Sequence, residues 1–230
     1  MARMHAISVA LLLLAALTLA GCDPVATRTV VVTATSAPVT PARASPAPSF
    51  ALPTPRPAAS APSDLTLTLS DVGGSFIETV AASHSNAQVA ATYHLSTAAL
   101  RRRGRISSYE TQFSRQQANG ILQIDDVVAA WHSPAGARWD MQRVVSQLLG
   151  SKPAPRGIQS INAPDLGDVR RAITFRGGRQ PANLIDYALI FQRGRYRAYV
   201  QVVGVTGTFA DADVLHLAQI VDRRIQRASS

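Results

Sequence analysis

The residues of 105–114 fall into two alternating sets, with Tyr109 and Phe113 in one and Ile106 in the other. A period of two is typical of a strand that buries one face. An apolar-rich run follows at 121–131, and Asn119-Gly120 between the two runs is a strong signal for a tight turn. The pattern therefore predicts a β-hairpin over 105–131.

A second hairpin is predicted nearer the carboxyl end. Residues 183–192 and 195–205 have the pattern of two strands, and Arg193-Gly194 is the expected turn between them. Shorter strands are expected at residues 76–82, 158–161 and 170–175.

Helical periodicity marks two longer segments. Over 211–227, apolar residues repeat every three or four positions on one stripe: Val214, Leu217, Ala218, Val221 and Ile225. Ser133-Pro134, a cap followed by proline at the first helical position, opens another helix that ends at Gly150. Its predicted apolar face consists of Ala137, Met141, Val144, Val145 and Leu148.

A third helix is expected after the first strand. Ser85 or Asn86 would cap it, and it would run to about Arg103 with Gly104 as its stop. Its inward side chains would be Val89, Tyr93 and Leu100.

The order of these elements predicts the fold class. Hairpin followed by helix occurs twice, at about 105–149 and 183–227, with little side-chain identity between the two units. We expect an α+β fold, a mostly antiparallel sheet with about three helices packed on one face. Residues 64–230 are numerous enough to form this fold as a single globular domain with its own core.

The amino end has a different pattern. Arg3 supplies a positive charge, residues 7–20 are almost wholly apolar, and the small pair Ala20-Gly21 directly precedes Cys22. This order is typical of an export signal, and the apolar run is short for a membrane span.

The four residues Leu19, Ala20, Gly21 and Cys22 resemble the lipobox of bacterial prolipoproteins. The resemblance implies that residues 1–21 are a signal peptide, cleaved between Gly21 and Cys22. It also implies that the Cys22 thiol carries a diacylglycerol and that fatty acids such as palmitate anchor the protein. The expected location is the extracytoplasmic side of a bacterial cell membrane.

Residues 22–63 are expected to be a disordered or extended tether. Nine of the chain's 14 prolines lie between residues 23 and 63, mostly among Ala, Ser and Thr. The segment has too few large apolar side chains to offset the entropy of folding. Since Cys22 is the single cysteine, the domain beyond the tether has no disulfide and no thiolate metal site.

Beyond the lipobox, the domain loosely resembles the uncharacterised α+β modules of exported actinobacterial and related lipoproteins. It has no signature residue of a named family, so this resemblance assigns no functional residue.

Arginine dominates the charge, because 22 of the 23 basic residues are arginine and the formal net charge is +9. Arg101, Arg102 and Arg103 are expected at a helix end, and Arg193, Arg195 and Arg197 around the second hairpin turn. We expect these side chains in solvent, either as an anion-binding surface for an envelope component or as a solvated basic face. An exported, lipid-tethered protein is not expected to bind nucleic acid.

The sequence selects no catalytic residue, metal ligand or cofactor. It has no Gly-x-Ser-x-Gly and no His-x-x-x-His, and His84, His94, His132 and His216 belong to separate predicted elements. Asp125 and Asp126 are adjacent, so on a strand they would face opposite sides. A loop calcium site at Asp165 and Asp168 is less favoured than a turn with solvated acids.

The leading hypothesis is a lipid-anchored extracytoplasmic binding or interaction module without catalysis of its own. Its partners would be the membrane, through the lipid on Cys22, and an anionic envelope component or a protein. One alternative is an envelope hydrolase whose site is assembled from dispersed residues. Another is a structural surface spacer, which would have no pocket.

Overall fold

The computed structural model describes residues 60–177 and 181–229. The predicted signal peptide, Cys22 and residues 23–59 of the predicted tether lie outside the described residues. Among the described residues, no helix has the length and apolar character needed to cross a membrane.

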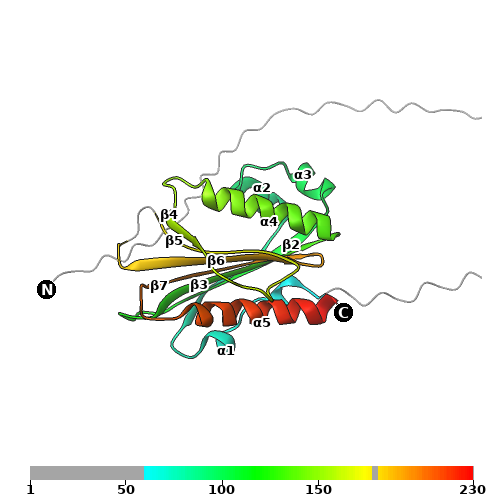
Figure 1. Ribbon diagram of the computed structural model, residues 1–230. Helices are drawn as coiled ribbons and strands as arrows, with labels where there is room; N and C mark the ends of the chain where they lie inside the picture. Colours follow the sequence, from blue (N-terminus) through cyan, green and yellow to red (C-terminus); the bar gives the residue numbers. More distant parts are fainter. Residues whose placement is uncertain (1–59, 178–180, 230) are drawn as a thin grey trace, which may run out of the picture. The chain divides into compact units, whose positions relative to one another are not determined.

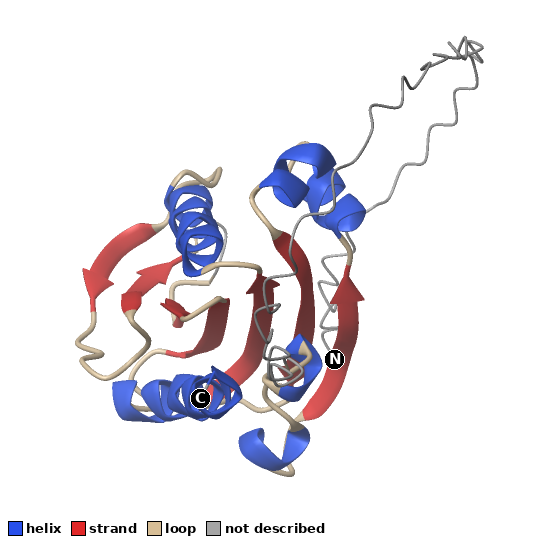
Figure 2. Ribbon diagram, turned by 90° about the vertical axis from the view of Figure 1, so that its right-hand side faces the viewer, coloured by secondary structure: helices blue, strands red, loops and turns tan. Residues whose placement is uncertain are grey.

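One seven-stranded sheet forms the centre of the fold, and every neighbouring pair of strands is antiparallel. The strands in spatial order are β1-β2-β3-β7-β6-β5-β4, so the two predicted hairpins meet where β3 pairs with β7. Figure 2 shows that the sheet is curved. The strands are β1 (Ile77–His84), β2 (Arg105–Ser114), β3 (Ile121–Trp131), β4 (Arg156–Ser160), β5 (Val169–Arg176), β6 (Leu184–Arg193) and β7 (Tyr196–Val205).

Helices cover both faces of this sheet (Figure 1). They are η1 (Pro62–Asp64), α1 (Leu69–Val72), α2 (Asn86–Thr92), α3 (Thr97–Arg102), α4 (Pro134–Leu149) and α5 (Asp211–Ser229). The α+β class and the antiparallel sheet are confirmed, but the prediction that the helices share one face is wrong. The reason is visible in β6, where seven consecutive residues are buried, so both faces of the central strands need a cover.

The single helix predicted over residues 86–103 is also wrong, because the structure has two short helices there. The first ends at Tyr93, His94 adopts a positive φ of 52°, and the Leu95 amide donates to the Ala90 carbonyl at 2.8 Å. This is the Schellman arrangement that terminates helices. Ser96 then caps the next helix by accepting from the Ala99 amide. Tyr93 is consequently 44% exposed and not inward-facing.

The face covered by α5 holds the main core, and all five residues of the predicted stripe on α5 are buried. The amino-terminal segment of the domain also packs into this core through Leu65 and Leu67. The Leu67 amide donates to Asp126 Oδ2 at 2.7 Å, and the Tyr196 hydroxyl donates to the Ser60 carbonyl at 3.1 Å. The fold therefore includes residues 60–63, which the sequence analysis assigned to the tether.

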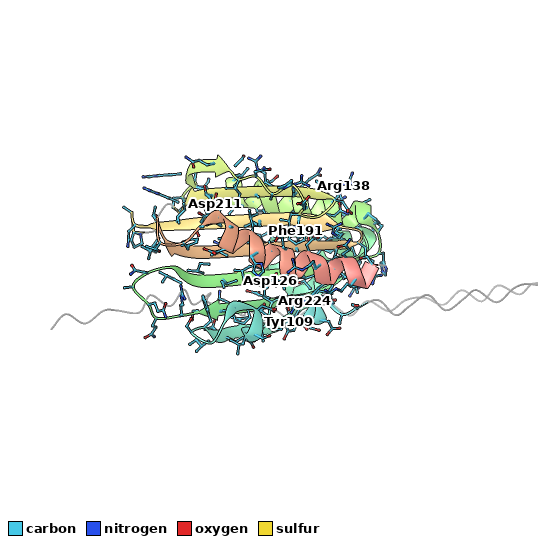
Figure 3. The ribbon with its side chains drawn as sticks, turned by 60° about the horizontal axis from the view of Figure 1, so that its bottom comes forward. Tyr109, Asp126, Arg138, Phe191, Asp211 and Arg224 are labelled. Atoms are coloured by element: carbon cyan, nitrogen blue, oxygen red, sulfur yellow. The ribbon has the colours of Figure 1, made fainter. Side chains whose placement is uncertain are left out.

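Asp126 is a buried acidic residue on the face of the sheet that α5 covers, and Figure 3 labels it close to Arg224 of α5. Burial raises the pKa of Asp126 to about 7, although the Leu67 amide and Arg224 act in the opposite direction. Arg224 itself bonds to Asp71 and to the Thr66 carbonyl, so α5 holds the amino-terminal segment against the sheet.

Candidate ligand-binding groove

The face covered by α4 is not one continuous core. Two small apolar clusters lie on it, one around Trp131 and Leu100 and one around Ile173 and Phe175. Between them, β2, β3 and β7 present polar or charged side chains toward α4 at positions such as Glu110, Asp125 and Arg197. This polar strip keeps α4 from packing closely along its whole length.

Two adjoining cavities occupy that strip. The smaller, of about 90 Å³, extends toward His84 and Arg105, and the larger, of about 280 Å³, extends toward Asp125 and Tyr199. They share four lining residues, Tyr93, Glu110, Val127 and Arg197. We call the two cavities together the α4 groove. The larger cavity is near the lower limit of small-molecule sites, which is about 300 Å³.

A buried ion-pair network fixes α4 over the groove. Asp140 of α4, 1% exposed, accepts from Arg197 Nε of β7 at 3.0 Å and from Arg143 Nε at 2.9 Å. Burial alone would raise the pKa of Asp140, but Arg197 and Arg143 hold it below its usual value. The carboxylate therefore stays charged and links helix to sheet.

The smaller cavity ends at a second polar group. Arg105 is 5% exposed and donates to Ser108 Oγ at 2.7 Å, to Asn86 Oδ1 at 2.8 Å and to the His84 carbonyl. Burial lowers its pKa to about 10. His84 Nε2 lies 2.7 Å from Glu110 Oε2, so both of these side chains are also partnered.

The larger cavity differs, because Asp125 in its wall has no hydrogen bond or ion pair to any described residue. Its Oδ1 atom is inaccessible to solvent. Burial, assisted by repulsion from Glu110, raises the pKa of Asp125 to about 7. The nearby Tyr199 hydroxyl donates to Gln201 Oε1 at 2.6 Å, and burial together with Asp125 raises its pKa.

The six arginines predicted to bind anions differ in their surroundings in the structure. Arg101, Arg102 and Arg103 are exposed as expected, and Arg103 also lies over the Trp139 ring at 4.3 Å. Anion binding by these three stays a prediction.

The prediction of a solvated hairpin tip is wrong for Arg193 and Arg197. Arg197 is 6% exposed and bound to Asp140, because its strand position faces α4. Arg193 makes two 2.6 Å bonds to Asp222 of α5, an arrangement that raises its pKa. Arg195 is half-buried beside Tyr196, and with Gly194, φ 53°, it forms the turn that was predicted one residue earlier.

The predicted opposition of Asp125 and Asp126 is confirmed, since Asp126 faces α5 and Asp125 lines the α4 groove. Asp168 accepts from the Gly194 amide at 2.8 Å and so anchors the hairpin turn. Among the described residues, no group of three His, Cys, Asp or Glu has metal-site geometry.

His84, Glu110 and Ser108 meet at the smaller cavity, which bears on the hydrolase alternative. His84 is paired with Glu110, but the Ser108 hydroxyl accepts from Arg105 and makes no hydrogen bond to the imidazole. A serine nucleophile needs that bond to its base, so this grouping lacks the geometry of an activated serine.

A separate cavity of about 480 Å³ lies beside β4 and β5 and is lined by residues such as Arg156, Phe175 and Pro181. Its lining includes Gly177 and Pro181, and the residues between these two lie outside the described part of the chain, so the α4 groove is taken as the candidate site.

Sequence reasoning missed most of the groove. Asp125 was singled out only for its strand geometry, and Glu110 and Asp140 were not noticed. The one sequence signal for Asp125, Glu110 and Asp140 is a charged residue within a strand or helix that is otherwise apolar. Charged residues are equally common on solvent-exposed faces, so this signal does not identify a site.

Comparisons with known proteins add little. No family model matches the chain, and no curated protein matches it. A search of solved structures finds the extracellular domain of PknH from Mycobacterium tuberculosis, at 12% identity and a TM-score of 0.48. The likeness covers 74% of this chain and 98% of that one. A likeness of this size supports no inference about fold, compartment or function.

Proposed function

We propose that the described domain is the ligand-binding module of a lipid-anchored protein on the extracytoplasmic side of a bacterial membrane. Its binding site is the α4 groove. The observation that carries this proposal is the pair of adjoining cavities between α4 and the sheet, with a carboxylate that has no partner in the wall of the larger one. An apolar pocket with a few convergent polar groups and a perturbed pKa is the usual form of a small-molecule site.

Rigidity of the surroundings supports the proposal. The Asp140 network fixes α4, and the hydrogen bonds of Arg105 fix the opposite end of the groove. A site whose walls are held before binding loses less conformational entropy when a ligand enters. A structural spacer gives no physical reason for leaving such a space unfilled, since packed cores are more stable.

The proposed binding site is tested by a substitution that fills the groove with a larger side chain. Val144 lies on α4 and lines the larger cavity, whereas Ser146 is exposed on the same helix and lines neither cavity of the groove. The full chain in detergent micelles would be screened by saturation-transfer NMR against a small-fragment library, with empty micelles as the blank. We expect Val144→Trp to remove most hits that Ser146→Trp retains. Equal hit lists for two variants with intact melting transitions would refute the groove as the site.

The anchor has its own test. Cys22→Ala should abolish incorporation of a labelled fatty acid in a bacterial host, because the mutant lacks the thiol that the lipobox presents. Label that persists in the mutant would overturn the lipid anchor and leave the groove proposal untouched.

A further inference from the structure

The larger cavity of the α4 groove has an imbalance of hydrogen-bonding groups. Three charged side chains line it: Glu110, Asp125 and Arg197. Glu110 bonds to His84, and Arg197 bonds to Asp140 and to the Val127 carbonyl. Among the described residues Asp125 has no partner, so the cavity offers one acceptor carboxylate without a donor.

Neighbouring side chains do not supply that donor, and Gln112, opposite Asp125 on β2, makes its hydrogen bond with Thr79 instead. Gln201 is directly opposite Asp125 in the register, but its amide donates to Asp186 at 3.0 Å. The Tyr199 hydroxyl donates its proton to Gln201. An ionised carboxylate without a donor destabilises the folded state. Because Oδ1 is closed to solvent, a ligand in the cavity would relieve part of that cost by donating a hydrogen bond to the other oxygen, Oδ2.

The other residues lining the larger cavity indicate the chemistry of the rest of a ligand whose donor group pairs with Asp125. Val127, Val144 and Leu148 contribute apolar surface, and the rings of Tyr93 and Tyr199 lie on the same cavity. Apolar walls around a carboxylate suit an ammonium group on a short hydrophobic body. The Tyr93 ring adds no further cation site, because the Arg143 guanidinium already lies over it at 4.8 Å.

We propose that the α4 groove binds a small primary amine, whose ammonium group pairs with Asp125 and whose apolar part packs against Val127, Val144 and Leu148. This inference rests on the proposed function and specifies the charge class of the ligand. The arginines of the groove do not favour an anion instead, because Arg143 and Arg197 share Asp140 and both terminal nitrogens of Arg105 donate to acceptors of their own.

Binding should depend on pH, since the amine pairs with the ionised carboxylate. The other charged or titratable groups around Asp125 include its neighbour Asp126 on β3, Glu110 on β2, Arg197 and Tyr199 on β7, Asp186 on β6, Arg143 on α4 and Tyr93 after α2. Because burial raises the pKa of Asp125 to about 7, the affinity for an amine should increase as pH rises from 6 to 8.

Three probes of similar shape test the charge class: benzylamine as the cation, benzyl alcohol as the neutral analogue and benzoate as the anion. They would be titrated by NMR into the full chain in detergent micelles, with the blank subtracted. At pH 8, benzylamine should bind at least about tenfold more tightly than either analogue, as expected for a charge-assisted hydrogen bond.

Asp125→Asn should remove that preference and the pH dependence while leaving benzyl alcohol binding unchanged. Glu110→Gln is the matched control, and it should have a smaller effect because Glu110 already has a partner in His84. Tighter binding of benzoate or benzyl alcohol, or unchanged benzylamine binding by Asp125→Asn, would overturn the inference but keep the groove as a site. Absence of binding by all three probes would overturn the inference, whereas the proposed function stands or fails separately on the Val144→Trp screen.

Discussion

The two faces of the central sheet are covered by helices of similar length, α4 with 16 residues and α5 with 19, yet the faces differ in what lies beneath. Under α5, the stripe residues are buried and join one large apolar core. Under α4, Ala137 and Met141 are buried, but Val144 and Leu148 are half-exposed and line a cavity. One face provides stability, and the other has space for a ligand.

Two consecutive residues of β3 show the difference at the level of single groups. Burial raises the pKa of both Asp125 and Asp126 to about 7. Asp126 accepts a backbone amide from the amino-terminal segment, whereas Asp125 faces the groove without a partner. The same side chain is thus a structural acceptor on one face and, in the proposal above, a ligand-binding group on the other.

The largest expected effect comes from breaking the network that fixes α4. Asp140→Leu leaves Arg197 buried without a counter-charge and should cost about 3–5 kcal/mol. At about 2–4 °C per kcal/mol for a chain of this size, the melting temperature should fall by roughly 6–20 °C.

Two further variants control this experiment. Asp140→Leu combined with Arg197→Met should recover part of the loss, because Arg143 is then the one partner of Asp140 left without a counter-charge. Arg195→Gln at the hairpin turn should change stability by less than about 1 kcal/mol, as half-buried or exposed charges usually do. Equal effects of Asp140→Leu and Arg195→Gln would contradict the account of α4.

A matched pair of truncations compares the faces directly. Leu217→Ala in the α5 core should cost about 2–4 kcal/mol, because it leaves a cavity among buried side chains. Leu148→Ala beside the groove should cost about 1 kcal/mol, because its side chain is already partly exposed. Thermal denaturation measures both, and a larger loss for Leu148→Ala would reverse the comparison.

Asp126 should make stability depend on pH. Its folded-state pKa of about 7 lies above the usual aspartate pKa of 3.8, so between these values the folded protein keeps a proton that the unfolded chain has lost. Stability should therefore decrease as pH rises from about 4 to about 7, by at most about 1.4 kcal/mol per pH unit from this residue.

Asp126→Asn should reduce that decrease without abolishing it, because the amide does not ionise but Asp125, whose pKa is also about 7, still does. Chemical denaturation at several pH values provides the measurement, and Asp165→Asn, at an exposed position, is the control. If the pH profile of Asp126→Asn matched that of the wild type, the buried carboxyl would not be the source.

The smallest expected effect is a gain in the stability of the folded protein. Asp125→Asn should raise stability at pH 8 by about 1 kcal/mol, because it removes a partly desolvated charge that has no partner. A gain in stability from a residue required for binding is expected at functional sites. A loss of stability at pH 8 would show that Asp125 has a structural partner.

Much of the fold could be predicted because it is encoded locally. The strands 105–114 and 121–131, the Ser133 cap and the stripe of α5 depend on neighbouring residues, and all are confirmed. The helix break at Tyr93–Leu95 was missed because His94, not glycine, takes the left-handed position.

The groove could not be predicted, because its residues meet only through tertiary structure. Arg197 looked solvated beside a turn, and its partner Asp140 is 57 residues earlier in the chain, on α4. Whether a strand position faces a filled core or a cavity depends on the helix above it, which the local pattern of the strand does not specify. The unpaired state of Asp125 likewise depends on how Tyr199 and Gln201 bond to each other.

The most direct test of the difference between the faces is a map of backbone amide shifts in the isotope-labelled full chain during titration with benzylamine at pH 8. The account predicts saturable shifts at groove residues such as Tyr93, Gln147 and Tyr199, and no shifts along the buried stripe of α5. Shifts centred on the α5 face, or spread evenly over both faces, would contradict the assignment of the α4 groove as the binding site.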